Sequence, residues 1–338
     1  MNKRFVCLDY LRIVCAFAIV VLHVTSASLT YATGATKSAV IAMHFSTILT
    51  SWAVPVFFII TGFLWLGDDK ACSFKTVGKH ILKFIVTLFT VGWLYGFLEI
   101  VFNTHSFNIN STLESLKNVL TGNLWDHMWY VYAVIGIYMI LPLIKPFFIK
   151  SNIKDDMILL SLSFFWTVIL PYVEKMFSIS MPVKFAATSW IFYVMLGGII
   201  SKHKEKLANL KIRIISVILI ILSVIAIVIK YVNNPGFHVV GYKSLSVCIM
   251  AAAITVLIIS YENKFPVKKL ITEISVCCWG IYLIHPFVIN LIIKFIKFNP
   301  LDYLWIITIP LTCILIFALC AISIWILRKI PLIKKYIF

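Results

Sequence analysis

The chain has 338 residues, 62% of them hydrophobic, and a mean hydropathy of +1.01. A soluble globular domain does not need so much apolar sequence, whereas a protein that crosses a membrane many times does. The formal net charge of +17 would suit nucleic acid, but the Lys and Arg residues gather in alternate loops between apolar runs. That placement argues against nucleic acid as a partner and indicates the lipid bilayer instead.

Ten apolar segments predict an all-α fold of about ten membrane-spanning helices. They cover roughly residues 5–28, 41–66, 78–102, 128–149, 157–173, 186–201, 212–232, 243–261, 271–293 and 303–327. Because these spans and their short loops use nearly the whole sequence, we expect one transmembrane domain over residues 1–338. Most of the Lys and Arg residues then fall on one side of the membrane, which predicts that both termini are cytoplasmic.

The first apolar segment carries three ionisable residues, Asp9, Arg12 and His23. Each would cost about 2.5–3.5 kcal/mol in lipid, so we expect them to face protein or a watery cavity. From Arg12 to His23 an α-helix advances by eleven residues and turns by about 1,100°, which is within about 20° of a whole number of turns. The two residues therefore share one face of the helix, about 16 Å apart along its axis. Asp9 precedes Arg12 by three residues and lies within its reach. One helix thus presents an ion-paired cation near its start and a titratable imidazole towards its other end.

Two other interpretations of this segment are open. Its basic start, its apolar run and the sequence TSAS resemble a signal peptide. However, a signal sequence does not normally contain Asp9 and Arg12, and more membrane segments follow. The second alternative is a purely structural role for the buried arginine and histidine.

Further polar residues collect at the depth of the outer leaflet in this topology. They come from several different helices: His23, His44, Glu99, Asp126, His127 and His285. For His44 and Asp126 an interfacial polar residue is the favoured interpretation. A functional role is favoured for His23, Glu99 and His285, because apolar sequence flanks each of them. Histidine can serve as a general base or proton shuttle, and the planar donors of arginine suit phosphate.

The sequence gives no sign of a metal site or of a disulfide framework. The eight cysteines lie mostly inside apolar runs without a CxxC spacing, which predicts packing residues. No two histidines have a spacing that would place both on one helix face as metal ligands, so we expect no metal.

Two stretches predict local features of the fold. In residues 54–65, Pro55 and Gly62 predict a kink and a close approach of a second helix. In the long outer loop, residues 111–120 (STLESLKNVL) form an amphipathic stretch that is able to lie on the membrane surface. This stretch could cover an opening in the protein or simply connect two spans, and the sequence favours neither role.

Together these residues resemble the acyltransferase 3 family of bacterial inner-membrane acyltransferases. The similarity rests on Asp9, on the Arg-x10-His spacing of Arg12 and His23, and on three stretches: PVFFIITGF at 55–63, HMWYVYAVIGIYMILPLI at 127–144 and GIYLIHP at 280–286. At Thr61 the family often has Ser. The four motifs occur in order and extend over nearly the whole chain. This sequence resembles the short form of the family, which has no extracytoplasmic esterase-like domain.

The resemblance implies a ten-helix membrane enzyme in the bacterial inner membrane. Such an O-acetyltransferase takes an acyl group, usually acetyl, from cytoplasmic acetyl-CoA and delivers it to a hydroxyl of a cell-envelope glycan. The residues that it implies are Arg12, His23 and Glu99 for catalysis, Asp9 and Arg12 for acetyl-CoA, and His127, Trp129, Tyr282 and His285 for the glycan. Two alternatives remain: a transporter or flippase of a glycan intermediate, which also uses charges at the midplane, and an acyltransferase that uses succinyl or another donor.

Overall fold

Every regular element in the computed structural model is a helix, over the residues that it describes: 4–67, 72–104, 108–178, 190–236 and 241–338. Within these residues, eight helical segments are long and apolar enough to cross a membrane: Val6–Thr30, Lys37–Leu66, Phe74–Thr104, Asp126–Lys150, Ile153–Phe177, Leu210–Asn233, Lys269–Phe295 and Trp305–Leu327. Two shorter apolar helices, Ile191–Lys202 and Leu245–Ile259, match the sixth and eighth predicted segments. The predicted all-α polytopic membrane fold is confirmed. Residues 186–189, where the sixth prediction begins, lie outside the described residues.

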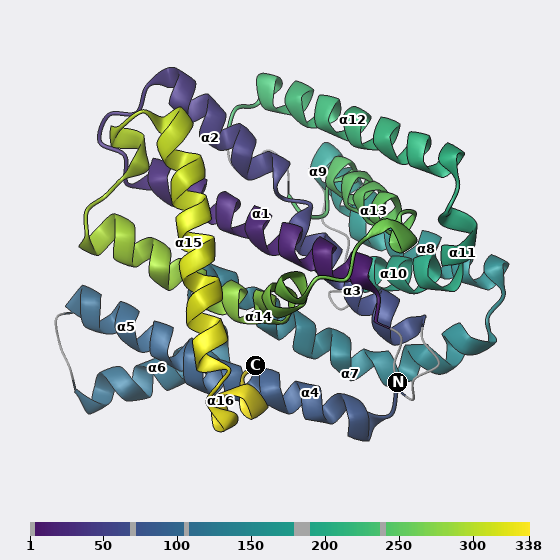
Figure 1. Cartoon of the computed structure of the whole chain (residues 1–338), viewed down its shortest axis with the longest axis horizontal. Coiled ribbons are helices and arrows are strands. Elements are labelled where there is room, and N and C mark those ends of the chain that lie inside the picture. Colours follow the sequence, from purple (N-terminus) through teal and green to yellow (C-terminus); the bar gives the residue numbers. More distant parts are fainter. Residues whose placement is uncertain (1–3, 68–71, 105–107, 179–189, 237–240) are drawn as a thin grey trace. The chain divides into compact units, whose positions relative to one another are not determined.

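The chain divides into two compact units, drawn in Figure 1. The first unit contains Met1–Asp68 and Phe148–Trp325, and the second contains Asp69–Phe147 and Ile326–Phe338. The first unit is built from α1 (Val6–Thr30), α2 (Lys37–Leu49), α3 (Ala53–Leu66), α8 (Ile153–Phe164), α9 (Leu170–Phe177), α10 (Ile191–Lys202), α11 (Lys204–Leu207), α12 (Leu210–Asn233), α13 (Leu245–Ile259), α14 (Lys269–Asn290) and most of α15 (Trp305–Leu327).

In the first unit, α1 is the helix around which the others are arranged. It packs against α2, α3, α13 and α14, while α3 packs on α10 and α12 on α13 (Figure 1). The inward face of α1 is largely apolar, with Leu8, Leu11, Cys15 and Ile19 all buried. The polar residues of α1 are therefore held by a packed helix with defined neighbours.

The second predicted span is two helices, α2 and α3, which are separated by residues 50–52. Pro55 lies in the first turn of α3, where its missing N–H is tolerated. This break is the kink that Pro55 predicts.

The close approach predicted at Gly62 is also present. A Cβ atom on Gly62 would lie 1.7 Å from the carbonyl oxygen of Val194 on α10. In return, a Cβ on Gly197 would lie 2.0 Å from the carbonyl oxygen of Ile59. The two glycines let the backbones of α3 and α10 touch, as small residues do between membrane helices.

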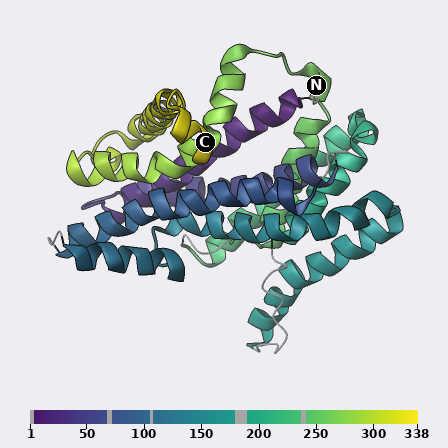
Figure 2. The ribbon, with the colours of Figure 1, turned by 90° about the horizontal axis from the view of Figure 1, so that it is seen from below.

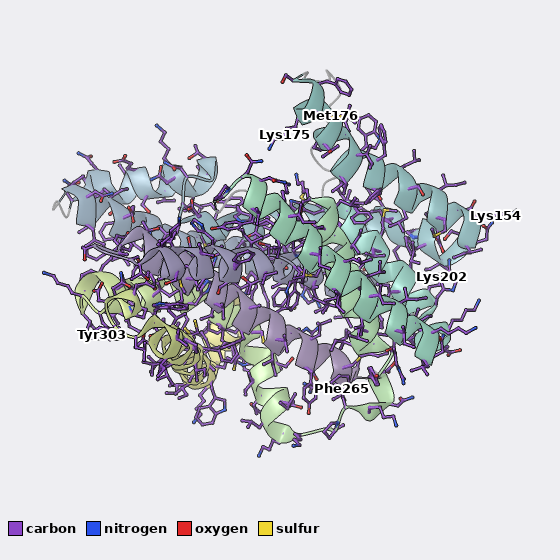
Figure 3. The ribbon with its side chains drawn as sticks, turned by 90° about the horizontal axis from the view of Figure 1, so that it is seen from above. Lys154, Lys175, Met176, Lys202, Phe265 and Tyr303 are labelled. Atoms are coloured by element: carbon purple, nitrogen blue, oxygen red, sulfur yellow. The ribbon has the colours of Figure 1, made fainter. Side chains whose placement is uncertain are left out.

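An ion pair between the partly exposed Lys202 and the buried Asp156 ties together the end of α10, the start of α8 and the segment before α8. Lys202 donates to Asp156, which is fully buried, at 2.7 Å, and to the carbonyl of Ser151 at 2.7 Å. Ser151 in turn donates to the other carboxylate oxygen of Asp156 at 2.5 Å. Figure 3 shows Lys202 and Lys154 at one end of the first unit and Tyr303 at the other. This placement fits the prediction that most Lys and Arg residues fall on one side of the membrane; which side that is stays a prediction.

The second unit contains α4 (Phe74–Thr87) and α5 (Trp93–Thr104), which are joined by the π-helical turn Leu88–Gly92. It also contains α6 (Ile109–Thr121), the short turn Asp126–Met128, most of α7 (Trp129–Lys150), and α16 (Pro331–Tyr336), which packs on α4.

Helix α6 is the amphipathic stretch predicted in the outer loop, and it folds back beside α5 (Figure 2). Its buried face is formed by small residues, and Ser115 donates to the carbonyl of Trp93 at 2.6 Å. Ile109, Leu113 and Leu120 are exposed on its other side. This apolar side suits contact with lipid at the membrane surface.

The eight cysteines all lie within the described residues, none is in a disulfide, and seven of them are buried. The prediction that they are packing residues is therefore consistent with the fold. Several of them, including Cys7, Cys15 and Cys320, are completely covered by neighbouring side chains.

Candidate functional site

The first candidate region lies around Asp9, in the first turn of α1. A carboxylate is favoured there, because the backbone N–H groups of a helix start point towards it. Asp9 Oδ1 accepts from Arg12 at 3.3 Å and from the Ser275 hydroxyl at 2.7 Å, and Oδ2 accepts from Arg4 at 2.6 Å. The buried carboxylate therefore has three donors from two helices and the segment before α1.

The two arginines around Asp9 remain partly open to solvent. The exposed fraction is 45% for the side chain of Arg4 and 30% for that of Arg12, against 5% for Asp9. Two guanidinium groups thus share Asp9, while a second carboxylate, Glu262, lies close enough for its charge to act on Cys7 in the same turn of α1. Lys204 adds a further cation nearby, with its ammonium 4.9 Å from the centre of the Phe5 ring. The arrangement suits an anion that approaches from the aqueous side.

The second candidate region lies further along the same two helices. His23 on α1 and His285 on α14 have ring centres 4.9 Å apart. His285 is completely buried, whereas His23 is partly exposed. The rings of Tyr282 and His285 lie 6.2 Å apart, and Tyr282 stacks in turn on Trp279 at 5.4 Å. A titratable pair of imidazoles is therefore set among aromatic rings.

The hydrogen bonds of His285 run to its own helix. Its Nδ1 lies 2.8 Å from the carbonyl oxygen of Tyr282 and 3.1 Å from that of Ile281. Its Nε2 is buried as well. The helix backbone therefore fixes the orientation of this ring.

Helices α1 and α14 hold both regions. The Asp9–Ser275 hydrogen bond joins the two helices near their first turns, and the His23–His285 contact joins them further along. The structure thus brings together four of the predicted residues, Asp9 with Arg12 and His23 with His285, in two pairs on one pair of helices.

Glu99 and His127 belong to a separate cluster in the second unit. Glu99 accepts from the Trp125 indole at 2.9 Å and from the Asn103 amide at 3.2 Å. Trp125 stacks on Tyr95 with ring centres 4.3 Å apart, and the buried His127 meets the edge of Tyr95 at 5.5 Å. Within this unit Glu99 therefore anchors an aromatic cluster that covers His127.

The remaining polar residues of the predicted pattern lie in ordinary environments. His44 shares a hydrogen bond with the Tyr231 hydroxyl at 2.9 Å. Asp126 is exposed at the start of a short turn, and Trp129 packs on the ring of its neighbour Tyr130. In the part of the chain that the structure describes, no three His, Cys, Asp or Glu side chains are grouped as metal ligands would be.

Four residues around these sites were not among the predicted ones: Arg4, Ser275, Tyr95 and Trp125. Arg4 has a signal in the sequence, since a basic residue directly before a membrane helix can fold back onto an acidic first turn. Ser275 has none, because 266 positions separate it from Asp9.

Comparison with known proteins identifies the family. A family model described as an acyltransferase domain, that of the acyltransferase 3 family, matches residues 5–328. No curated protein and no solved structure matches the chain. The match extends through both compact units and includes the Asp9 cluster, the His23–His285 pair and the Glu99 cluster. The chain therefore belongs to the acyltransferase 3 family and is a multi-pass membrane acyltransferase.

Proposed function

We propose that the protein is an O-acetyltransferase of the bacterial inner membrane. It takes acetyl from cytoplasmic acetyl-CoA and transfers it to a hydroxyl group of a cell-envelope glycan. The observation that carries the proposal is the pairing of an anion-binding region and an imidazole pair at different positions along α1 and α14. The acetyl-CoA donor carries phosphate groups and needs an anion-binding site. The acceptor hydroxyl must lose its proton and needs a base.

The anion-binding region suits the donor. CoA carries phosphate groups, and the planar guanidinium of arginine binds phosphate with two parallel hydrogen bonds. Arg12 is the predicted phosphate ligand, and Arg4 belongs beside it because it shares the same carboxylate. Asp9 keeps both guanidinium groups in place, and Ser275 holds Asp9.

The imidazole pair suits the chemical step. In this step the acceptor oxygen attacks the carbonyl carbon of the thioester, a new C–O bond forms and the C–S bond breaks. His23 accepts the proton of the acceptor hydroxyl, and that proton then goes to the departing thiolate of CoA. The products are the acetyl ester and free CoA, and no redox partner is needed.

Recognition of the glycan is assigned to the aromatic and polar residues of the predicted outer side. His285 lies beside His23, and Tyr282 lies next to His285. In the second unit, Glu99 and Trp129 contact the acceptor in this proposal, while the buried His127 supports the ring of Tyr95 beside Trp125, which Glu99 holds. Aromatic rings next to polar side chains suit the apolar faces and the hydroxyl groups of sugars. We also propose that the two compact units act as one acyltransferase domain.

The test uses membranes that contain the full chain, with empty membranes as the blank. They are incubated with radiolabelled acetyl-CoA and the envelope fraction of the host, and the label is followed into glycan by chromatography. We expect labelled glycan with the intact chain and none with His23→Ala. His44→Asn is the matched control, since the asparagine amide lies near the position of Nδ1 and can keep the hydrogen bond to Tyr231.

The outcomes separate the alternatives. Label from succinyl-CoA but not from acetyl-CoA would correct the donor. Glycan that crosses the membrane without label from either donor, with the chain inserted, would overturn the enzymatic proposal in favour of transport.

A further inference from the structure

The dipeptide His285–Pro286 interrupts the hydrogen-bond pattern of α14. In a regular α-helix, the N–H of residue 286 donates to the carbonyl of residue 282. Proline has no N–H, so Pro286 cannot make this bond to Tyr282. The side chain of His285 donates there instead, because its Nδ1 lies 2.8 Å from the Tyr282 carbonyl oxygen.

This contact decides where the His285 ring carries its proton. A carbonyl oxygen only accepts hydrogen bonds, so Nδ1 must be the donor. The Ile281 carbonyl oxygen lies 3.1 Å from the same nitrogen and also favours a proton on Nδ1. A neutral imidazole has one N–H, so the neutral ring has its lone pair on Nε2.

The two rings of the pair differ in their access to a substrate. His285 is completely buried and its Nε2 is covered. His23 is partly exposed, and its ring centre lies 4.9 Å from that of His285. Of the two, His23 is therefore the ring that reaches an acceptor hydroxyl, and His285 lies behind it.

We propose that Pro286 and the Tyr282 carbonyl hold His285 in the tautomer with the proton on Nδ1, and that the lone pair on its Nε2 accepts the N–H of His23 when the neighbouring His23 ring turns towards it during the reaction. The second nitrogen of His23 then carries a lone pair and takes the proton of the acceptor. His285 and Pro286 are positioning residues in this scheme, which replaces the predicted role of His285 in binding the glycan. The catalytic consequence rests on the proposed function, whereas the tautomer does not.

The tautomer is tested without any substrate. The full chain is labelled with 15N-histidine, placed in lipid bilayers and examined by solid-state NMR. His285→Asn and His285→Gln each remove one pair of ring signals, so either variant assigns His285. We expect a protonated Nδ1 and an unprotonated Nε2. A protonated Nε2 with an unprotonated Nδ1 would overturn the proposal.

The role of the proline is tested with Pro286→Ala, which returns an N–H to the helix. The new amide competes with His285 for the Tyr282 carbonyl, so we expect a second set of His285 signals with the proton on Nε2. Pro310→Ala is the matched control, because Pro310 also lies inside an apolar helix, α15, but is exposed. Identical His285 signals in the native chain and in Pro286→Ala would remove Pro286 from the mechanism.

The two amide variants then test which nitrogen of His285 matters for turnover. Asparagine places its amide near Nδ1 and keeps a donor to the Tyr282 carbonyl, but it has nothing at Nε2. Glutamine reaches the position of Nε2 with an acceptor oxygen. We expect kcat to fall about 100-fold in His285→Asn and only about tenfold in His285→Gln, with KM for acetyl-CoA unchanged in both.

The reverse order, with His285→Asn the more active variant, would overturn the positioning role. Failure of the proposed function has a different signature, because no form of the chain, the native one included, would then transfer acetyl while the NMR result stood. Acetyl transfer with the wrong tautomer would refute the inference alone.

Discussion

The two regions that α1 and α14 hold use opposite means to keep an ionisable group in a membrane protein. Near the first turns, Asp9 is buried but has Arg4, Arg12 and Ser275 as donors. Further along, two carbonyl groups of its own helix orient His285, the buried ring of the His23–His285 pair. One region is a charged network whose two arginines are partly open to solution, and the other is an imidazole pair in which the helix backbone orients the buried ring of His285.

This difference indicates that the first region binds the donor and the second region takes part in the chemical step. A charged network that keeps two guanidinium groups half open gives binding energy to an anion, and it does so equally before and during the reaction. An imidazole pair acts on the reaction only when a proton moves. We therefore expect damage at Asp9 and Arg12 to appear in stability and in KM, and damage at His23 to appear in kcat.

The largest effect is expected at His23. His23→Ala removes the proposed base, and kcat should fall by about 10²–10⁴-fold, with KM for acetyl-CoA unchanged. Steady-state transfer with purified protein in nanodiscs measures both constants. His44→Asn should keep the native values. A kcat within threefold of the native one in His23→Ala would remove His23 from the chemical step.

The second effect is a loss of stability at Asp9. Asp9→Ala leaves Arg4 and Arg12 side by side without their shared carboxylate, and the Ser275 hydroxyl without its acceptor. Losing hydrogen bonds to a buried charged group costs about 1.5–3 kcal/mol. Thermal unfolding in detergent, followed by size-exclusion chromatography with fluorescence detection, should show a lower midpoint. Asp302→Ala, which removes an exposed carboxylate outside both regions, is the matched control. An unchanged midpoint in Asp9→Ala would mean that the network stabilises nothing.

The order and the length of the helices were predictable because hydropathy over the length of a span reports burial in lipid directly. The Asp9–Arg12 pair was predictable for a similarly local reason, since residues three apart on a helix are neighbours. The break at residues 50–52 was visible only through Pro55, because the apolar run from 41 to 66 continues across it.

Contacts between segments that are distant in the sequence could not be predicted from it. The pairing of Asp9 with Ser275 and of His23 with His285 depends on how α1 packs on α14, and no local pattern reports that. For the same reason the sequence did not reveal that Glu99 bonds Trp125 and Asn103. Topology alone had placed Glu99, His127 and His285 at one depth, and it could not reveal the division into two compact units.

The third effect separates binding from chemistry at Arg12. Arg12→Lys keeps the positive charge but loses the paired donors that match a phosphate. We expect KM for acetyl-CoA to rise about tenfold, with kcat within twofold of the native value. Arg213→Lys is the matched control, because Arg213 bonds Ser260 and covers the Tyr261 ring in another part of the same unit. A tenfold loss of kcat with an unchanged KM would place Arg12 in the chemical step instead.

The smallest effect should come from Ser275, which joins the two helices near Asp9. Ser275→Ala removes one of three donors to the carboxylate and leaves both arginines in place, so the expected cost is about 1 kcal/mol. Ser223→Ala is the matched control, since that hydroxyl is also buried but bonds only the Leu219 carbonyl of its own helix. If α14 positions His285 through this bond, Ser275→Ala should also lower kcat a few-fold, while Ser223→Ala should not. A change in stability without a change in kcat would show that the two regions are mechanically independent, although the same two helices carry them.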